Sequence, residues 1–286
     1  DYTRVKGLFN LASYVGDGSA APDLGPKCYC AHGGWDEQTL LGGTRAAPEL
    51  AAARPGQSAG TTRLHVDMSD AINVLVHVEG ASCELENGRP LPKLAGATVT
   101  HDVGAVWHIF SQDDTTALRE FLPQIFPSVA SSGSILLDSS VYLDGAMLGR
   151  LERQASIRPH VVMQRLGDAV IIPAGCAHQV CNVRPCIKIA ADFVGPEHVG
   201  RCMRLAEERR LLPADHPRRA DVLGLHQLLL NAACACLVIL EAEREARQKG
   251  AASRIAAAPG LAASAAPDRP IDAAAAAQVP VEPPRN

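Results

Sequence analysis

The sequence has no run of about 18 uncharged apolar residues, which is the length that a membrane-spanning helix needs. Its longest apolar stretch, Ala232–Leu240, is too short. Basic residues are not in excess either, because 27 Lys and Arg stand against 31 Asp and Glu, for a formal net charge of −4. The missing apolar run leads us to expect no membrane partner. Because nucleic-acid-binding domains carry a basic footprint, we also expect no direct sequence-specific binding to nucleic acid.

Motifs of several other protein classes are missing as well. No Gly-x-Gly-x-x-Gly follows a strand-like run, and no Gly-x-x-x-x-Gly-Lys is followed by Ser or Thr, which disfavours nucleotide-binding folds. The chain opens on DYTRVKG without an initiator Met or a signal peptide, and we interpret it as a fragment of a longer protein. Its nine cysteines are an odd number in a chain too large to need disulfides, which favours a reducing intracellular compartment.

The 286 residues do contain enough apolar material for a packed core, with 47% hydrophobic and 20% charged residues. Short β-branched runs bounded by Gly, Pro or Asp predict strands at Asn73–Val78, Val103–Phe110, His160–Leu166, Ala169–Pro173 and Cys186–Val194. Helical periodicity predicts helices at Thr115–Phe126, Asp138–Gln154, Pro196–Leu212 and Arg219–Arg247. Short strands with flanking helices favour an antiparallel β-barrel or a double-sheet jelly roll surrounded by helices.

Two segments have a composition that is poor in bulky apolar residues. Residues 250–286 are dominated by Ala and Pro and lack an amphipathic repeat, so we expect a disordered tail. Gly42–Gly60 has the Gly, Pro and Ala content of a long surface loop. The LxxLL pattern Leu225–Leu229 is interpreted as one face of a core helix. Trp107 is interpreted as a core residue, with His108 on the other face of the same strand.

The stretch TTRLHVDMSD, Thr61–Asp70, carries the chemistry. On a strand, His65 and Asp67 point to the same face because residues two apart share a face. A non-haem Fe(II) site needs two histidines and one carboxylate, and His178, just after the strand-like AVIIPAG, is the candidate for the third ligand. A lone His-x-Asp pair is more often surface polarity than a metal site, so the prediction depends on the three residues together.

The chain resembles the JmjC catalytic domain of the histone H3 lysine-9 demethylase subfamily, which includes Hairless and related plant proteins. The motifs that carry this resemblance occur in order over about residues 1–245: PDLGPKCY, LHVDMSDAINVLVHV, GAVWHIF, LGDAVIIPAGCAHQVCNV and CIKIAADFVGPEHV. The resemblance implies a mainly β fold with helices, a cupin-like double-stranded β-helix that holds Fe(II) and uses 2-oxoglutarate and O2 as co-substrates. It implies a catalytic domain over 1–249, with a core at about 22–200 and C-terminal helices at about 196–248. On this pattern His65, Asp67 and His178 match the iron ligands.

Four residues are candidates for contact with 2-oxoglutarate. Thr62 is one residue out of phase with His65 on a regular strand, but related oxygenases use a Thr at this offset. Lys188 lies in the apolar strand CIKIA, where it either points inward to an anion or outward to solvent. Tyr29 either touches the co-substrate or is a packed aromatic residue, and Asn73 either touches it or is a polar residue of an edge strand.

The resemblance further implies a function. It predicts demethylation of methylated lysine nine of the histone H3 tail by N-methyl hydroxylation, with release of formaldehyde and succinate, on chromatin in the nucleus. A homodimer is compatible with the sequence. Two alternatives stay open: a JmjC hydroxylase that acts on a protein side chain without demethylation, and an inactive JmjC chromatin scaffold. The segment between Val78 and Gly104 is shorter and less charged than in the family, which puts substrate choice in question.

Overall fold

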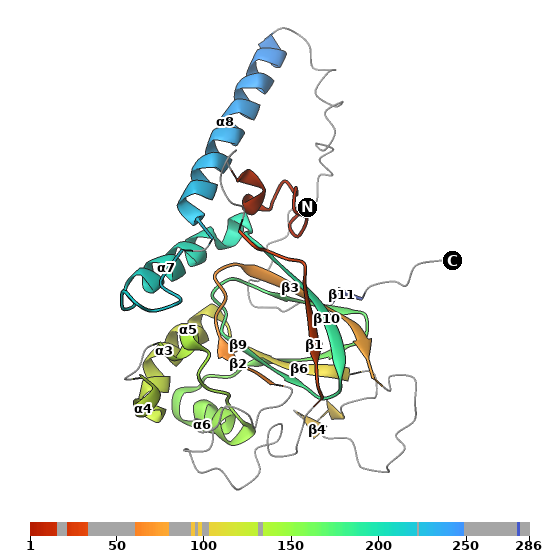
Figure 1. Cartoon of the computed structure of the whole chain (residues 1–286), viewed down its shortest axis with the longest axis vertical. Helices are drawn as coiled ribbons and strands as arrows, with labels where there is room; N and C mark the ends of the chain where they lie inside the picture. The colour runs from red at the N-terminus through yellow and green to blue at the C-terminus, as the bar shows by residue number, and fades with distance from the viewer. Residues whose placement is uncertain are drawn as a thin grey trace, which may run out of the picture.

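The fold of this chain, taken from a computed structural model, consists of two antiparallel sheets that face each other, with helices on the outside (Figure 1). The structure describes residues 1–15, 22–33, 61–79, 93–94, 97–98, 103–130, 134–221, 223–248 and 279–280. This arrangement confirms the predicted mainly β jelly roll with surrounding helices.

The larger sheet has the strand order β1-β10-β3-β8-β11. Its strands are β1 (Lys27–Ala31), β10 (Cys186–Phe193), β3 (Asp70–Val78), β8 (Asp168–Ile172) and β11 (Val279–Pro280). The second sheet has the order β2-β9-β6-β7. Its strands are β2 (Thr61–His65), β9 (His178–Asn182), β6 (Val103–Ile109) and β7 (His160–Arg165). A short pair, β4 (Lys93–Leu94) and β5 (Ala97–Thr98), forms the third sheet of the described residues.

The strand sequences explain which side of each sheet is buried. In β10, Cys186, Lys188 and Ala190 are buried and alternate with the partly exposed Ile187 and Ile189, as expected for residues that share a strand face. All seven residues of β6 are buried, because this strand lies between β9 and β7 and is covered on both faces. The predicted strands of β3, β6, β7, β8 and β10 are therefore present, whereas β1, β2 and β9 were not predicted.

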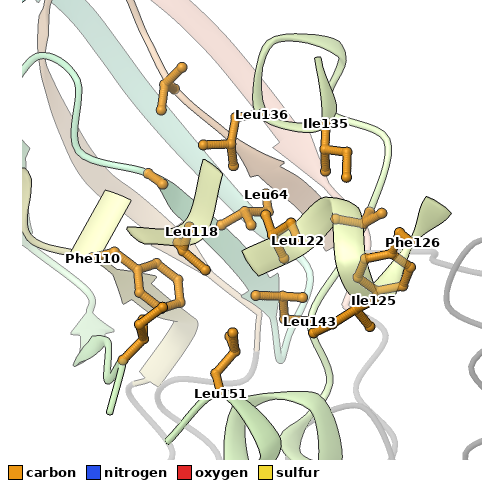
Figure 2. Packing of buried hydrophobic residues seen from close by; sticks show 14 of the residues in the cluster. Leu64, Phe110, Leu118, Leu122, Ile125, Phe126, Ile135, Leu136, Leu143 and Leu151 are labelled. Carbon is orange, nitrogen blue, oxygen red and sulfur yellow. The ribbon is translucent and has the colours of Figure 1, made fainter. Parts of the chain in front are cut away.

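A group of helices packs beside β2 and β9 (Figure 1). Its members are α3 (Gln112–Ile125), α4 (Pro127–Ala130), α5 (Ile135–Asp138) and α6 (Gly145–Ala155). Leu118 and Leu122 of α3 are fully buried in one cluster with Leu64 of β2 (Figure 2). Burying side chains of this size contributes about 1.5–3 kcal/mol each, so this cluster fastens the strand that carries His65 to the helical layer.

The helix predicted over Asp138–Gln154 is present from Gly145 on, as α6, but its predicted start at Asp138 is wrong. The structure ends α5 at Asp138 and begins α6 at Gly145. Ser139 has a left-handed backbone with a φ of 51°, which ends α5, and the Asp144 side chain accepts a hydrogen bond from the Met147 N–H at 2.8 Å to begin α6. The periodicity continued across the break because Val141 and Leu143 are buried without being helical.

The last helices follow β10 in the chain (Figure 1). They are η2 (Pro196–His198), α7 (Val199–Arg210) and α8 (Leu225–Gln248), and η1 (Leu11–Tyr14) packs against α8. Leu225 and Leu228 are buried in a cluster with Met68 and Val194, as predicted for the LxxLL pattern. The predicted loop Gly42–Gly60 lies outside the described residues, and so does the predicted tail 250–286 apart from β11.

The sequence expectation that no segment could span a membrane needs correction for α8. Within the described residues, Leu225–Glu245 is long and apolar enough to cross a membrane by length and composition, with a mean hydropathy of 1.7 and 17% of its 18-residue apolar window buried. The expectation missed it because it counted uninterrupted apolar residues, and α8 also contains His226, Gln227 and Asn231. In the structure α8 extends away from the two sheets (Figure 1).

Candidate metal centre

Strand pairing brings together three donors that are far apart in the sequence. His65 at the end of β2 lies directly opposite His178 at the start of β9, and their ring centroids are 4.2 Å apart. Asp67 follows β2, with its carboxylate oxygens 3.7 Å from His65 Nε2 and 3.4 Å from His178 Nε2. One ligand atom from each residue lies within 4.8 Å of the other two, so the cluster could hold a metal ion.

Backbone carbonyls orient both imidazoles. Nδ1 of His65 donates to the Arg63 carbonyl at 2.7 Å, and Nδ1 of His178 donates to the Cys176 carbonyl at 3.0 Å. A proton on Nδ1 leaves the lone pair on Nε2, which is the nitrogen that faces Asp67. Burial lowers the pKa of His178 to about 4, and nearby His65 acts in the same direction. His178 is therefore neutral near pH 7, which is the form that binds a metal ion.

A β-bulge accounts for the position of Thr62. Thr62 pairs with Val180 and His65 pairs with His178, so three steps along β2 match two steps along β9. The extra residue shifts the side-chain alternation by one and places Thr62 on the same face as His65. Leu64, within the bulge, instead donates its backbone N–H to the Val141 carbonyl at 2.8 Å. On a regular strand Thr62 and His65 would point to opposite faces, and the bulge removes this difference.

A cavity of about 510 Å³ adjoins the three donors. All seven residues singled out in the sequence line it: Tyr29, Thr62, His65, Asp67, Asn73, His178 and Lys188. It lies between the two sheets, because its lining residues come from β1, β3 and β10 on one side and from β2, β6 and β9 on the other. The fold thus gathers these residues, and their individual roles stay predictions.

Lys188 is the buried cation of this cavity, with 5% of its surface exposed. Its Nζ donates to Asn182 Oδ1 and lies 5.3 Å from the centroid of the Trp107 ring. Burial lowers its pKa to about 8. In the part of the chain that the structure describes, no carboxylate forms an ion pair with Lys188. Because a buried charge is costly unless it is paired, this ammonium group is suited to an anionic ligand that enters from outside.

Tyr29 and Asn73 lie at different depths of the cavity. Tyr29 is 50% exposed on the edge strand β1, directly opposite Lys188 on β10, which rules out the reading as a packed core aromatic. Asn73 is buried on β3, between β10 and β8, so the alternative reading as an edge-strand residue is wrong. Gln164 Nε2 donates to the Asn73 carbonyl at 2.9 Å and to its Oδ1 at 3.4 Å.

Several lining residues were not predicted as site residues, namely Lys27, Trp107, Asn182 and Asp192. Trp107 is buried as expected, but its ring also forms a wall of the cavity, with the centroid 6.1 Å from that of His178. The sequence carried a signal for Asp192, because residues 188, 190 and 192 share one face of β10. Lys27 and Asn182 have no comparable signal, since each reaches the cavity through pairing with a distant strand.

Asp70 links the two segments that carry the three donors. Its Oδ1 accepts the Ala174 N–H at 2.7 Å, in the turn that precedes His178, and its Oδ2 accepts the Gly195 N–H at 2.9 Å. His198 Nδ1 donates to the same carboxylate at 2.6 Å. The Asp70 side chain is 1% exposed, so these hydrogen bonds form in a nearly dry environment. They hold the start of β3, three residues after Asp67, in place.

Comparison with known proteins gives the context for this geometry. The profile described as "JmjC domain, hydroxylase" matches residues 98–193, a range that includes His178. Lysine-specific demethylase 3A of Homo sapiens is 34% identical over 258 residues, which cover 85% of this chain and 18% of the relative. Lysine-specific demethylase JMJ26 of Arabidopsis thaliana is 32% identical, covering 79% of this chain and 28% of that protein. Lysine-specific demethylase 3 of Drosophila melanogaster is 32% identical, covering 84% and 28%.

The chain therefore spans less than a third of the length of these relatives. The profile match includes β9 with His178 and β10 with Lys188, whereas His65 and Asp67 precede it, and the observed jelly roll agrees with the match. By sequence, this chain contains a JmjC domain over residues 98–193 and is similar over most of its length to the lysine-specific demethylase 3 proteins.

Proposed function

We propose that this chain is the catalytic part of an Fe(II)- and 2-oxoglutarate-dependent dioxygenase that demethylates lysine nine of the histone H3 tail. The observation that carries the proposal is the buried Lys188, which pairs with no carboxylate of the described residues and lies in the same cavity as the His65, Asp67 and His178 cluster. A metal centre and a separate buried cation in one cavity suit a ligand that chelates the metal at one end and carries a carboxylate at the other, which describes 2-oxoglutarate.

The donor set fits the proposed metal. Two imidazoles and one carboxylate are the ligands that non-haem Fe(II) oxygenases use, and they leave open positions for small ligands. When bound, the iron supplies O2 activation coupled to oxidation of 2-oxoglutarate to succinate and CO2. We assign His65, Asp67 and His178 as its protein ligands, because their donor atoms converge within 4.8 Å at the cavity wall.

The chain's own residues supply binding and orientation. Lys188 would donate a charge-assisted hydrogen bond to the distal carboxylate of 2-oxoglutarate, and Thr62 would add a hydroxyl donor from the facing strand. We assign Tyr29 and Asn73 as further contacts of the co-substrate at the rim and at the floor of the cavity. Trp107 excludes water beside His178, since its ring is buried against that imidazole.

Mass spectrometry of methylated histone H3 peptides tests this proposal. The full chain is incubated with Fe(II), ascorbate, 2-oxoglutarate and a peptide methylated at lysine nine, and succinate and formaldehyde are measured in the same reaction. We expect loss of methyl groups in step with both products, and no turnover in a matched Asp67→Asn protein. A peptide that gains oxygen while keeping its methyl groups would identify a hydroxylase, and absence of succinate would identify a scaffold.

The proposed partners and location follow from the substrate. Histone H3 places the enzyme on chromatin in the nucleus, and microscopy of the tagged full-length protein tests this. We also propose that the chain does not recognise nucleic-acid sequence directly, in line with its formal net charge of −4. A homodimer stays a prediction, which sedimentation at several protein concentrations would test.

A further inference from the structure

The cavity has two ends of opposite charge along strand β10. Lys188, Ala190 and Asp192 all line it, because residues two apart on a strand share a face. Lys188 and Asp192 are four residues apart, which is about 13 Å along a strand, and the small Ala190 leaves space between them. An anionic co-substrate belongs at the Lys188 end, so the Asp192 end is suited to a cation.

The carboxylate of Asp192 already holds a cation supplied by the chain itself. Lys27 Nζ lies 2.8 Å from Asp192 Oδ2, and both side chains line the cavity. Burial raises the pKa of Asp192, and the negative charge of Asp67 contributes in the same direction. A carboxylate that is partly buried near a second carboxylate needs a positive partner to stay ionised.

The two partners differ in how easily they can move. Lys27 extends from the edge strand β1, and 34% of its side chain is exposed, so its long stem can turn towards solvent. Asp192 is 22% exposed and extends from β10, which is paired on both sides by β1 and β3. A cation that enters the cavity can therefore replace Lys27 without movement of the sheet.

We propose that Asp192 is the docking group for the ammonium group of the substrate's methylated lysine, and that Lys27 occupies this carboxylate until the substrate enters. The inference rests on the proposed function and adds to it a specificity-determining residue and a built-in competitor. Methylation keeps the positive charge of a lysine, so the substrate cation and Lys27 are of the same chemical class. The alternative is an ion pair that only fastens β1 to β10.

Opposite effects of two substitutions separate these readings. Binding of a labelled H3 peptide dimethylated at lysine nine is measured by fluorescence anisotropy with 2-oxoglutarate present, for Asp192→Asn and Lys27→Met. We expect Asp192→Asn to weaken binding about 10- to 150-fold, the range for a lost charge-assisted hydrogen bond. We expect Lys27→Met to tighten binding about two- to fivefold, because removal of a weak, partly exposed ion pair frees the carboxylate.

A fastening role predicts a different pattern. Both substitutions would then weaken binding together and lower the melting temperature, and this result, or unchanged binding in both, overturns the proposal. Arg119→Met is the matched control, since it breaks an ion pair of 3.0 Å with Glu208 outside the cavity lining.

Succinate formation is measured separately, so the outcome for the proposed function is distinct. Peptide binding that changes in opposite directions, in a protein that makes no succinate, supports the docking site and contradicts the dioxygenase. Failure of the unaltered protein to bind the methylated peptide overturns the docking site itself.

Discussion

Loss of the Lys188 charge should selectively weaken 2-oxoglutarate binding. Lys188 is 5% exposed, and among the described residues its ammonium group donates to Asn182 Oδ1 and lies over the face of Trp107. A carboxylate that enters this cavity forms a charge-assisted hydrogen bond worth about 1.5–3 kcal/mol. Removing it should raise the KM for 2-oxoglutarate about 10- to 150-fold. The kcat should fall less, because the keto acid still chelates the metal.

The pH dependence gives a second, independent signature of Lys188. Its pKa of about 8 means that the ligand-free protein loses this positive charge as the pH rises above 8, while 2-oxoglutarate stays ionised. The KM for 2-oxoglutarate should therefore rise up to about tenfold per pH unit above 8. Folding stability changes with pH in the opposite direction to 2-oxoglutarate binding. Between pH about 8 and the ordinary pKa of 10.5, the unfolded chain binds a proton at this lysine that the folded chain does not, so the contribution of Lys188 to stability rises with pH.

The assay is a 2-oxoglutarate titration of Lys188→Met, Lys188→Ala and Lys188→Arg at pH values from 7 to 9. Lys188→Met keeps most of the side-chain volume and removes the charge, so it separates electrostatics from packing. A thermal-shift titration with 2-oxoglutarate reports binding without turnover. An unchanged KM in the Met and Ala variants, or the same pH dependence in them as in the unaltered protein, would show that another residue holds the carboxylate.

Three further predictions address the metal, the support behind it and a helix start. Asp67→Ala should abolish turnover and Co(II) binding while the melting temperature changes little, and full activity in this variant contradicts the ligand assignment. Asp70→Ala should lower the free energy of unfolding by about 3–5 kcal/mol, because it leaves the Ala174 and Gly195 N–H groups without their acceptor. Urea denaturation measures this loss. A loss below about 1 kcal/mol shows that water replaces the carboxylate. Ser111→Ala should cost about 1 kcal/mol, since the Ser111 hydroxyl accepts the Asp114 N–H at the start of α3, and an unchanged denaturation midpoint would contradict this capping role.

The sequence by itself determined the residue types of the site and the local direction of several strands. His65 and Asp67 lie two apart, which predicts a common face on a strand, but β2 ends at His65 and Asp67 approaches both imidazoles from the segment that follows it. The same alternation placed Lys188 and Ala190 together on β10, and their burial agrees with it. These features depend on neighbours in the chain, so sequence pattern alone was sufficient to predict them.

Helix boundaries were predicted less well for an equally local reason. Apolar residues at helical spacing predicted a helix start at Asp138, but the left-handed Ser139 ends α5 there and the capping side chain of Asp144 begins α6 at Gly145. Capping competes with periodicity at such points, and periodicity alone does not record it. The α8 segment shows the same weakness, because a count of uninterrupted apolar residues overlooked a helix with a mean hydropathy of 1.7.

Only the tertiary structure decided how the donors and the cavity residues meet. The facing position of His65 and His178 depends on the register between β2 and β9, and the bulge in that register turns Thr62 into the cavity. The Lys27–Asp192 pair and the contact of Lys188 with Asn182 join strands that are distant in sequence. Strand register and bulges are set by packing and hydrogen bonding between distant segments, so no local pattern encodes them, and the site takes its shape only when both sheets have formed.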